Sequence, residues 1–135
     1  MFDLRGKNAV ITGSSKGLGK SIAKAMALHG ANVVISSRKA DVCQATADEI
    51  NNIDTPPLYG EKGKGVVIPC NMSDKTALEM LVEESRSQLG KIDILVCNAA
   101  SNPFFGSIKD IPDDAFEKIM NNNIKSNHNL CQMVI

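Results

Sequence analysis

The sequence has 135 residues, of which 43% are hydrophobic and 22% charged, a balance typical of one folded globular domain and unlike that of a disordered chain. Its 15 Lys and Arg residues balance its 15 Asp and Glu residues, so no net positive field exists to hold nucleic acid or an anionic membrane. No apolar run approaches the roughly 20 residues that span a bilayer, and residues 1–5 do not resemble a signal peptide. We therefore expect neither a nucleic-acid nor a membrane partner.

The cysteine and histidine residues favour a reduced, cytoplasmic protein without a metal centre. The four cysteines lie far apart and form no C-x-x-C pair, so free thiols are the favoured interpretation. His29 and His128 have no cysteine or carboxylate at metal-ligand spacing. A peroxisomal location is the alternative to the cytoplasm, because a C-terminal signal for it would lie outside these residues.

Short apolar runs alternate with longer helical patterns, which predicts βαβ units and a parallel sheet. Residues 8–12 predict a first strand that is covered on both faces. A helix is expected from about Gly17, with Leu18, Ile22 and Met26 along one side. Small side chains keep this helix thin enough to lie close to the sheet: Ala23, Ala25 and Ala27.

The middle of the chain predicts three more strands and a second helix. Residues 32–36 predict the second strand, and residues 41–51 predict the second helix. Residues 52–65 contain two prolines and three glycines, so a loop is expected there. Residues 65–70 predict the third strand, and residues 92–97 predict the fourth.

Two further helical regions are predicted in the second half of the chain. Ser73 is expected to cap a third helix. Pro112 and Asp113 open a last helical region, which runs to the end of the chain through the asparagine tract at residues 121–123. The third helix has one buried face in this interpretation: Leu78, Leu81, Val82, Ser85 and Leu89.

A glycine-rich turn, T-G-S-S-K-G-L-G at residues 12–19, joins the first strand to the first helix. Its three glycines suit a tight turn, a close approach of the backbone to a pyrophosphate, and close packing of helix on strand. The free N–H groups and the dipole of the helix also favour phosphate. An ordinary surface turn is the alternative, which the flanking strand and helix disfavour. We expect six residues of the turn to bind a dinucleotide: Gly13, Ser15, Lys16, Gly17, Leu18 and Gly19.

Three motifs together resemble the short-chain dehydrogenase/reductase family. The first is the T-G-x-x-x-G-x-G spacing at residues 12–19, and the second is the similarity of residues 92–100 to that family's I-D-x-L-V-N-N-A-G. The third is the similarity of residues 116–123 to its W-x-x-x-x-x-x-N segment. Residues 98–106 further resemble the NADP-dependent carbonyl and retinol reductase branch. The motifs follow one another in the family's order over the entire chain.

The resemblance implies a Rossmann-type α/β fold, in which a doubly wound parallel sheet has the strand order 3-2-1-4. It places one dinucleotide-binding domain over residues 1–135. It also implies hydride transfer between a nicotinamide and a carbonyl or secondary alcohol, so the expected partners are a dinucleotide and a small carbonyl or alcohol. A homo-oligomer is expected of the full-length protein.

The end of the second strand favours NADP over NAD. NAD-specific members of the family have an acidic residue there, which binds the ribose hydroxyls, whereas this sequence has Ser37 and Arg38. A carboxylate would repel a 2′-phosphate, but a guanidinium can hold it through two hydrogen bonds. The family also places Lys16 within reach of that phosphate. The alternative is that both cations are ordinary surface residues.

The resemblance places the adenine and the nicotinamide beside two further strand ends. Asn71 and Met72 follow the third strand, where the amide oxygen of Asn71 can replace a carboxylate that accepts from the adenine amino group. Cys97 replaces the first Asn of N-N-A-G and is interpreted as an inert core thiol. Three residues of this motif are expected beside the cofactor: Asn98, Ala99 and Ala100, the last in place of the family's Gly.

Of the family's catalytic residues, only the Asn has a match, Asn123, seven positions after Phe116. The one tyrosine is Tyr59, and Gly63 stands where a Y-x-x-x-K lysine would be. Asn is a poor interior helix residue, so the tract at 121–123 predicts a local break that frees a carbonyl, which resembles the family's seat for a proton-relay water. An Asn that only shapes the helix is the alternative.

Two classes of function follow from these motifs. We expect residues 1–135 to be the front part of a longer NADP-dependent oxidoreductase. The competing interpretation is a short protein that binds a nucleotide without catalysis, as a sensor or a regulator.

Overall fold

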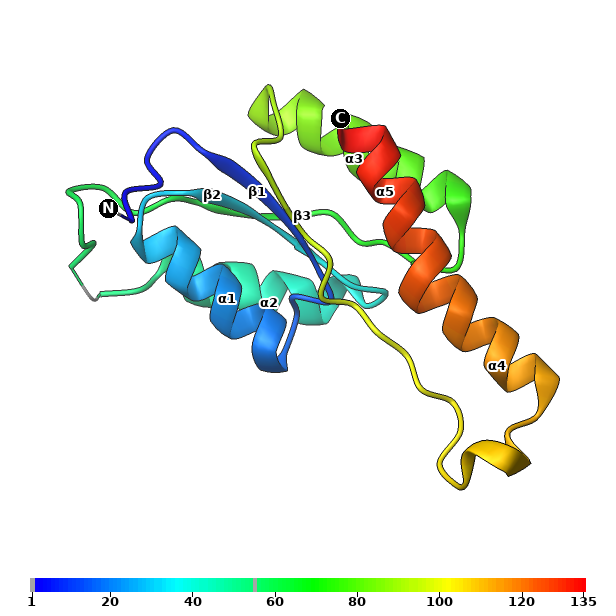
Figure 1. The fold of residues 1–135 in the computed structure, drawn as a ribbon. Helices are drawn as coiled ribbons and strands as arrows, with labels where there is room; N and C mark the ends of the chain where they lie inside the picture. The colour runs from blue at the N-terminus through cyan, green and yellow to red at the C-terminus, as the bar shows by residue number, and fades with distance from the viewer. Residues whose placement is uncertain (1, 55) are drawn as a thin grey trace.

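A computed structural model describes residues 2–54 and 56–135 of the chain as a four-stranded parallel sheet with helices on both faces (Figure 1). The strand order is β3-β2-β1-β4, which confirms the predicted Rossmann-type α/β fold and its order 3-2-1-4. The strands have these bounds: β1 Asn8–Thr12, β2 Asn32–Ser36, β3 Gly65–Val67 and β4 Ile94–Val96.

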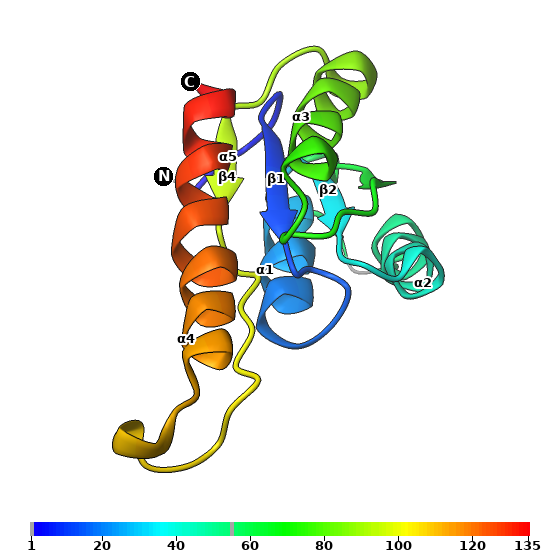
Figure 2. The same cartoon turned by 90° about the vertical axis from the view of Figure 1, so that its right-hand side faces the viewer.

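The helices form two layers, one on each face of the sheet (Figures 1 and 2). Alternate residues of β1 face opposite layers, so Ala9 and Ile11 pack with α1 and α2, and Val10 packs with α3 and α5. The helices have these bounds: α1 Gly17–Leu28, α2 Ala40–Asn51, α3 Lys75–Leu89, α4 Asp113–Met120 and α5 Ser126–Val134.

The third and fourth strands are shorter than predicted. Residues 65–70 and 92–97 were expected to be strands, but the regular ladder covers Gly65–Val67 and Ile94–Val96 alone. The pairing of the third strand nevertheless continues past its end, because the Cys70 N–H donates to the carbonyl beyond β2 at 3.0 Å. In the third strand the sequence pattern reports burial, which extends to Ile68 and Cys70 beyond the regular ladder.

Helix α1 packs on the sheet through its smallest side chains. Gly19, Ala23 and Ala27 are its buried residues, whereas Leu18 and Ile22 are 78% and 36% exposed. The apolar side expected from Leu18 and Ile22 is therefore not the face that packs on the sheet. The helix lies close to the strands through Gly and Ala, and of the three expected apolar side chains only Met26 packs, partly buried, against this core.

The N-cap of α3 is Asp74, so the expectation that Ser73 caps this helix is wrong. The Asp74 carboxylate accepts from the N–H groups of Thr76 and Ala77 at 2.9 and 3.3 Å. The Ser73 hydroxyl donates instead to the side chain of Asn122 at 2.9 Å. The predicted buried face of α3 is confirmed, since Leu78, Leu81, Val82 and Ser85 are buried and Leu89 packs against them.

The predicted helix break at the asparagine tract is a π-helical turn, Asn121–Lys125, between α4 and α5. The helix therefore continues with one widened turn, as Figure 2 shows for the rod formed by α4 and α5. The loop that precedes α4 contains a short 3-10 turn, Ile108–Asp110, and extends with α4 beyond the sheet.

Within residues 2–54 and 56–135, no helix combines the length and the apolarity that crossing a membrane requires. No three His, Cys, Asp or Glu side chains of these residues gather in a way that could hold a metal ion. Cys43 and Cys70 are buried, but Cys97 is exposed, so the interpretation of Cys97 as a core thiol is wrong. It lies at the end of β4, an edge strand of the sheet.

Candidate functional site

The predicted cofactor-binding residues meet at one edge of the sheet. All four strands are parallel, so the loops at 13–19, 37–38, 71–72 and 98–100 follow their carboxyl ends. The chain leaves β1 for β2 on one side and returns through α3 to β4 on the other. This switch of direction beside β1 is where open α/β sheets bind ligands.

The glycine-rich turn has a packed side and an open side. Gly13 has a φ of +66°, and a Cβ on it would lie 2.9 Å from the Ala99 Cα. A Cβ on Gly19 would lie 2.5 Å from the Gly13 carbonyl oxygen. Gly17 has a φ of +58° and nothing within 4 Å of an added Cβ. These three positions match a tight turn, close helix packing, and a backbone open to a phosphate at the N-terminus of α1.

Buried hydroxyl groups hold this turn in place. The Ser14 hydroxyl donates to the Ile11 carbonyl at 2.6 Å and accepts from the Ser36 N–H at 2.9 Å. The Thr46 hydroxyl donates to the Ser15 carbonyl at 2.9 Å. Sequence analysis missed Ser14 and Thr46, because nothing in a single sequence marks a hydroxyl that will support a turn from another element. The turn is therefore fixed to both β2 and α2.

Thr12 and Asn98 fasten the loop after β4 to the same turn. The Thr12 hydroxyl oxygen accepts from the N–H groups of Asn98 and Ala99 at 3.1 and 3.0 Å. The Asn98 side chain donates to the carbonyls of Thr12 and Gly13 at 3.0 and 3.1 Å. The Asn98 amide therefore positions the backbone around the site. Thr12 was named in the motif alone, and its role as an acceptor was not predicted.

Two cations stand exposed at the ends of β1 and β2. Lys16 and Arg38 are exposed, and neither forms a salt bridge within residues 2–54 and 56–135. Arg38 lines a hollow of about 320 Å³ together with Asn71, so the residues expected at the 2′-phosphate and at the adenine share one depression. The Ser37 hydroxyl lies 3.1 Å from the Cys43 sulfur. The hydroxyl is thereby directed at α2.

The loop after β3 is held from two directions. The Asn71 side-chain oxygen accepts from the Ser73 N–H at 3.2 Å, which leaves one lone pair of that oxygen for another donor. The Met72 carbonyl accepts from the Ser126 hydroxyl of α5. Burial, assisted by the nearby Asp74 carboxylate, raises the pKa of the Cys70 thiol to about 11. Cys70 is therefore protonated at neutral pH and supplies no nucleophile here.

Asn123 binds the backbone of the loop after β4. Its side-chain oxygen accepts from the Ser101 N–H at 2.8 Å, and its side-chain nitrogen donates to the Ser101 carbonyl at 3.0 Å. Its own carbonyl accepts from the Asn127 side chain at 2.8 Å. A side chain therefore partners the Asn123 carbonyl within the π-helical turn. The Asn127 side-chain oxygen is buried with no partner among the described residues.

Tyr59 lies away from this edge. Its ring is 5.8 Å from that of His29, the residue that ends α1. Since α1 runs back from the glycine-rich turn, its C-terminus is at the opposite edge of the sheet. This position agrees with the exclusion of Tyr59 as the catalytic acid.

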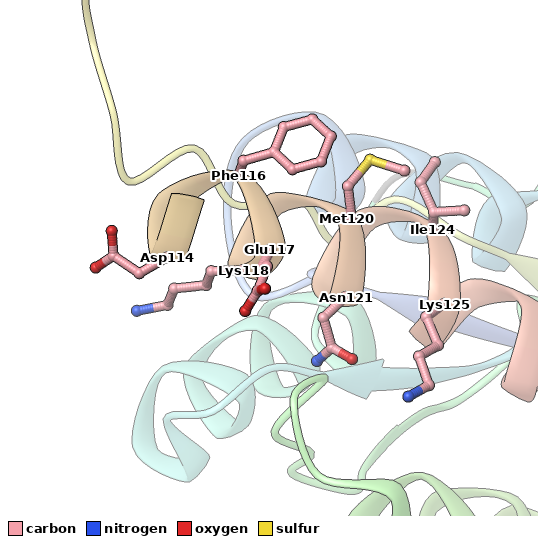
Figure 3. Close-up of a pocket in the computed structure, with 8 residues that line it drawn as sticks. All are labelled: Asp114, Phe116, Glu117, Lys118, Met120, Asn121, Ile124 and Lys125. Carbon is pink, nitrogen blue, oxygen red and sulfur yellow. The ribbon is translucent and has the colours of Figure 1, made fainter. Parts of the chain in front are cut away.

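A hollow larger than the one at Arg38 lies outside the candidate site, along the outer side of α4 and the π-helical turn (Figure 3). It has a volume of about 670 Å³. Phe116, Met120 and Ile124 follow one another along it. No strand end contributes to it, so size alone does not identify the dinucleotide site. The carboxyl edge is the candidate because the glycine-rich turn, the cations and the strand ends coincide there.

Comparisons with known proteins agree with this geometry. Residues 7–135 match the family model of the short chain dehydrogenase. The chain is 35% identical to the dehydrogenase/reductase SDR family member 4 of Bos taurus, over 98% of this chain and 44% of that protein. It is 37% identical to an L-rhamnose 1-dehydrogenase (NADP(+)) of Thermoplasma acidophilum, over 99% of this chain and 50% of that protein. The chain thus spans about half the length of the curated relatives it matches.

Solved structures show the same fold. A hydroxysteroid dehydrogenase from Escherichia coli superposes with a TM-score of 0.86 at 34% identity, over 98% of this chain and 52% of that one. A 3-ketoacyl-(acyl-carrier-protein) reductase from Brucella melitensis, complexed with NADH, superposes with a TM-score of 0.84 at 28% identity. That match covers 98% of this chain and 50% of the reductase.

Proposed function

Because this chain belongs to the short chain dehydrogenase family, we propose that it supplies the cofactor-binding half of an NADP-dependent oxidoreductase. The protein transfers hydride between the nicotinamide and a carbonyl or secondary alcohol. The observation that carries the proposal is the glycine-rich turn, whose Gly17 faces open space beside a strand end that bears Arg38 and no carboxylate. The expected partners are the dinucleotide and a small carbonyl or alcohol substrate.

The preference for NADP rests on this chain's own residues. One relative is named for NADP(+) and one solved relative is complexed with NADH, so the family as a whole does not decide the cofactor. Ser37 and Arg38 present a guanidinium and no acid at the end of β2. Arg38 has no salt-bridge partner within the described ranges, so its charge is available to a phosphate.

The remaining residues are assigned by their place along the edge. The N–H groups at the start of α1 bind the pyrophosphate, which their dipole favours. Lys16 assists Arg38 at the 2′-phosphate, while Asn71 and Met72 contact the adenine. The loop after β4 lies beside the nicotinamide. These positions form the proposed cofactor site: Gly13, Ser15, Lys16, Gly17, Leu18, Gly19, Ser37, Arg38, Asn71, Met72, Asn98, Ala99 and Ala100.

Binding of the two dinucleotides tests the cofactor assignment. NADP should bind more tightly than NAD in calorimetric titrations, because only NADP carries the 2′-phosphate. Arg38→Ala should weaken NADP binding by about 1.5–3 kcal/mol, the usual contribution of a charge-assisted hydrogen bond, and leave NAD binding nearly unchanged. Lys39→Ala is the matched control, since Lys39 is the next residue, carries the same charge and is also exposed. Equal affinities of the unmodified protein for NAD and NADP would contradict the assignment.

A nucleotide-binding sensor or regulator without catalysis is the second candidate. The open glycine-rich turn and the hollow at Arg38 would serve nucleotide binding alone equally well. Oxidation of NADPH, followed by its absorbance with a panel of ketones and aldehydes, separates the candidates. Turnover supports the oxidoreductase, whereas tight NADP binding with no turnover by the full-length protein supports the sensor.

We also propose that the full-length protein forms a homo-oligomer. Phe116, Met120 and Ile124 are 52%, 43% and 58% exposed. Large apolar side chains that gather on one helix surface favour association.

A further inference from the structure

The π-helical turn brings the asparagine tract against two separate loops of the candidate site. Ser73 belongs to the loop after β3, and Ser101 belongs to the loop after β4. Both loops follow strand ends on the carboxyl edge, one expected at the adenine and the other at the nicotinamide. Residues of one helical turn contact both.

Asn122 is the residue that touches both loops through one side chain. Its oxygen accepts from the Ser73 hydroxyl at 2.9 Å, and its nitrogen donates to the Ser101 hydroxyl, also at 2.9 Å. The amide is planar and rigid, so its two ends hold the two hydroxyls at a fixed separation. Ser73 and Ser101 are 28 residues apart in sequence.

The surrounding contacts keep Asn122 in this position. The Ser126 hydroxyl, one turn further along, shares its single proton between the Met72 carbonyl and the Asn121 carbonyl, the latter at 2.8 Å. Asn123 holds the Ser101 backbone. A π-helical turn is a costly local geometry that often marks functional sites. Here it sets the helix against both loops at once.

We propose that Asn122 is a positioning residue that couples the adenine side of the cofactor site to its nicotinamide side. The inference rests on the proposed dinucleotide function. A ligand on the loop after β3 orders Ser73, and Asn122 transmits that order to Ser101 without a shift of the backbone. The loop after β4 then has less freedom to lose when the nicotinamide half of the dinucleotide binds.

Two ligands that occupy different parts of the cofactor site test the coupling between its adenine and nicotinamide sides. The half-ligand 2′,5′-ADP carries the adenine and the 2′-phosphate but lacks the nicotinamide, whereas NADP occupies both sides. Asn122→Val removes both hydrogen bonds, so a ligand on the loop after β3 no longer orders Ser101. The affinity for NADP should therefore fall about fivefold or more. The affinity for 2′,5′-ADP should change by less than about twofold, because Met72 stays bound to Ser126.

Asn121→Val is the matched control. Asn121 precedes Asn122 in the same turn and is likewise partly exposed. Its side chain, however, lines the hollow along α4 (Figure 3). In Asn121→Val, the ratio of the NADP affinity to the 2′,5′-ADP affinity should equal that of the unmodified protein. Ser101→Ala, a smaller change, should reproduce part of the Asn122→Val effect and add little to it in the double variant.

Hydrogen exchange supplies a second readout. Addition of 2′,5′-ADP should slow amide exchange at residues 98–104 of the unmodified protein, although this ligand lacks the nicotinamide half. Asn122→Val should abolish that slowing. An unmodified protein that binds neither ligand overturns the proposed function and this inference with it. Binding of both ligands, with the affinity ratio and the exchange response retained in Asn122→Val, overturns the inference alone.

Discussion

Asn123 occupies both ends of its side-chain amide with the backbone of Ser101. Its removal leaves the N–H and the carbonyl of Ser101 without these partners, which costs about 1–3 kcal/mol if they stay away from water. The catalytic role that we propose for Asn123 must therefore be separated from this structural one. Rate per folded molecule and stability must be measured separately.

Asn123→Ala should slow hydride transfer by roughly 10 to 1,000-fold, the range over which a positioned proton transfer contributes. NADP affinity should fall by much less than the rate, because Asn123 contacts neither the glycine-rich turn nor Arg38 and reaches the site only through Ser101. The measurement is single-turnover oxidation of NADPH by a carbonyl that the full-length protein reduces. Asn121→Ala is the control. A variant that keeps its rate per folded molecule would leave Asn123 a structural role only.

Substitution by alanine should have different effects at Gly17 and Gly19, mainly on NADP binding at the first and mainly on stability at the second. Gly17→Ala adds a methyl group in open space at a φ of +58°, which costs about 1–2 kcal/mol. The methyl group stands where the backbone meets the phosphate, so NADP affinity should fall about tenfold or more. Gly19→Ala instead places a methyl group 2.5 Å from a backbone oxygen.

The Gly19 clash requires movement of the turn, and overpacking of this kind costs about 1–3 kcal/mol or more. Urea denaturation should therefore show the larger loss of stability in Gly19→Ala. A dinucleotide titration should show the larger loss of binding per folded molecule in Gly17→Ala. Unchanged NADP binding by Gly17→Ala would contradict the proposal that the phosphate binds beside Gly17.

Helix α2 is tied to α1 by one carboxylate. Glu49 forms salt bridges with Lys20 and Lys24. The hydrogen bonds from these two ammonium groups lower the pKa of Glu49 from its ordinary value of 4.5 to about 2. Because the folded-state pKa is depressed, the stabilisation is present above pH 4.5 and is lost as the pH falls towards 2.

Glu49→Gln should therefore lower the thermal midpoint at pH 6, and the difference from the unmodified protein should shrink as the pH falls below 4.5. The effect should be small and reduced by salt, because the carboxylate is exposed. Glu83→Gln is the control, since Glu83 is exposed on α3 and forms no salt bridge within the described residues. A difference that is constant from pH 6 to pH 3 would contradict the coupling.

At the level of elements, the sequence pattern predicted what local chemistry determines. The first two strands have their predicted bounds, because both are continuous apolar runs with turn residues at their ends. The cap of α3 could not be predicted, since Ser73 and Asp74 are both good caps and a contact to Asn122 decides between them. The contact face of α1 was missed because periodicity favours Leu18 over Gly19.

At the level of the whole molecule, the strand order and the edge that gathers the site followed from the order of the motifs. What the sequence could not show is how the loops are joined. Thr12 meets Asn98 across 86 positions, and Asn122 meets Ser73 across 49. Such contacts depend on the packed arrangement of sheet and helix, and no local signal in the chain reports them.

The central claim is that the carboxyl edge of the sheet, and not the larger hollow along α4, binds the dinucleotide. Backbone amide shifts in an NMR titration with NADP test it directly. The account predicts shifts at residues 13–19, 37–38, 71–73 and 98–101, with little change at Phe116, Met120 and Ile124. Shifts that concentrate on α4, or that leave residues 13–19 unchanged at saturating NADP, would contradict it.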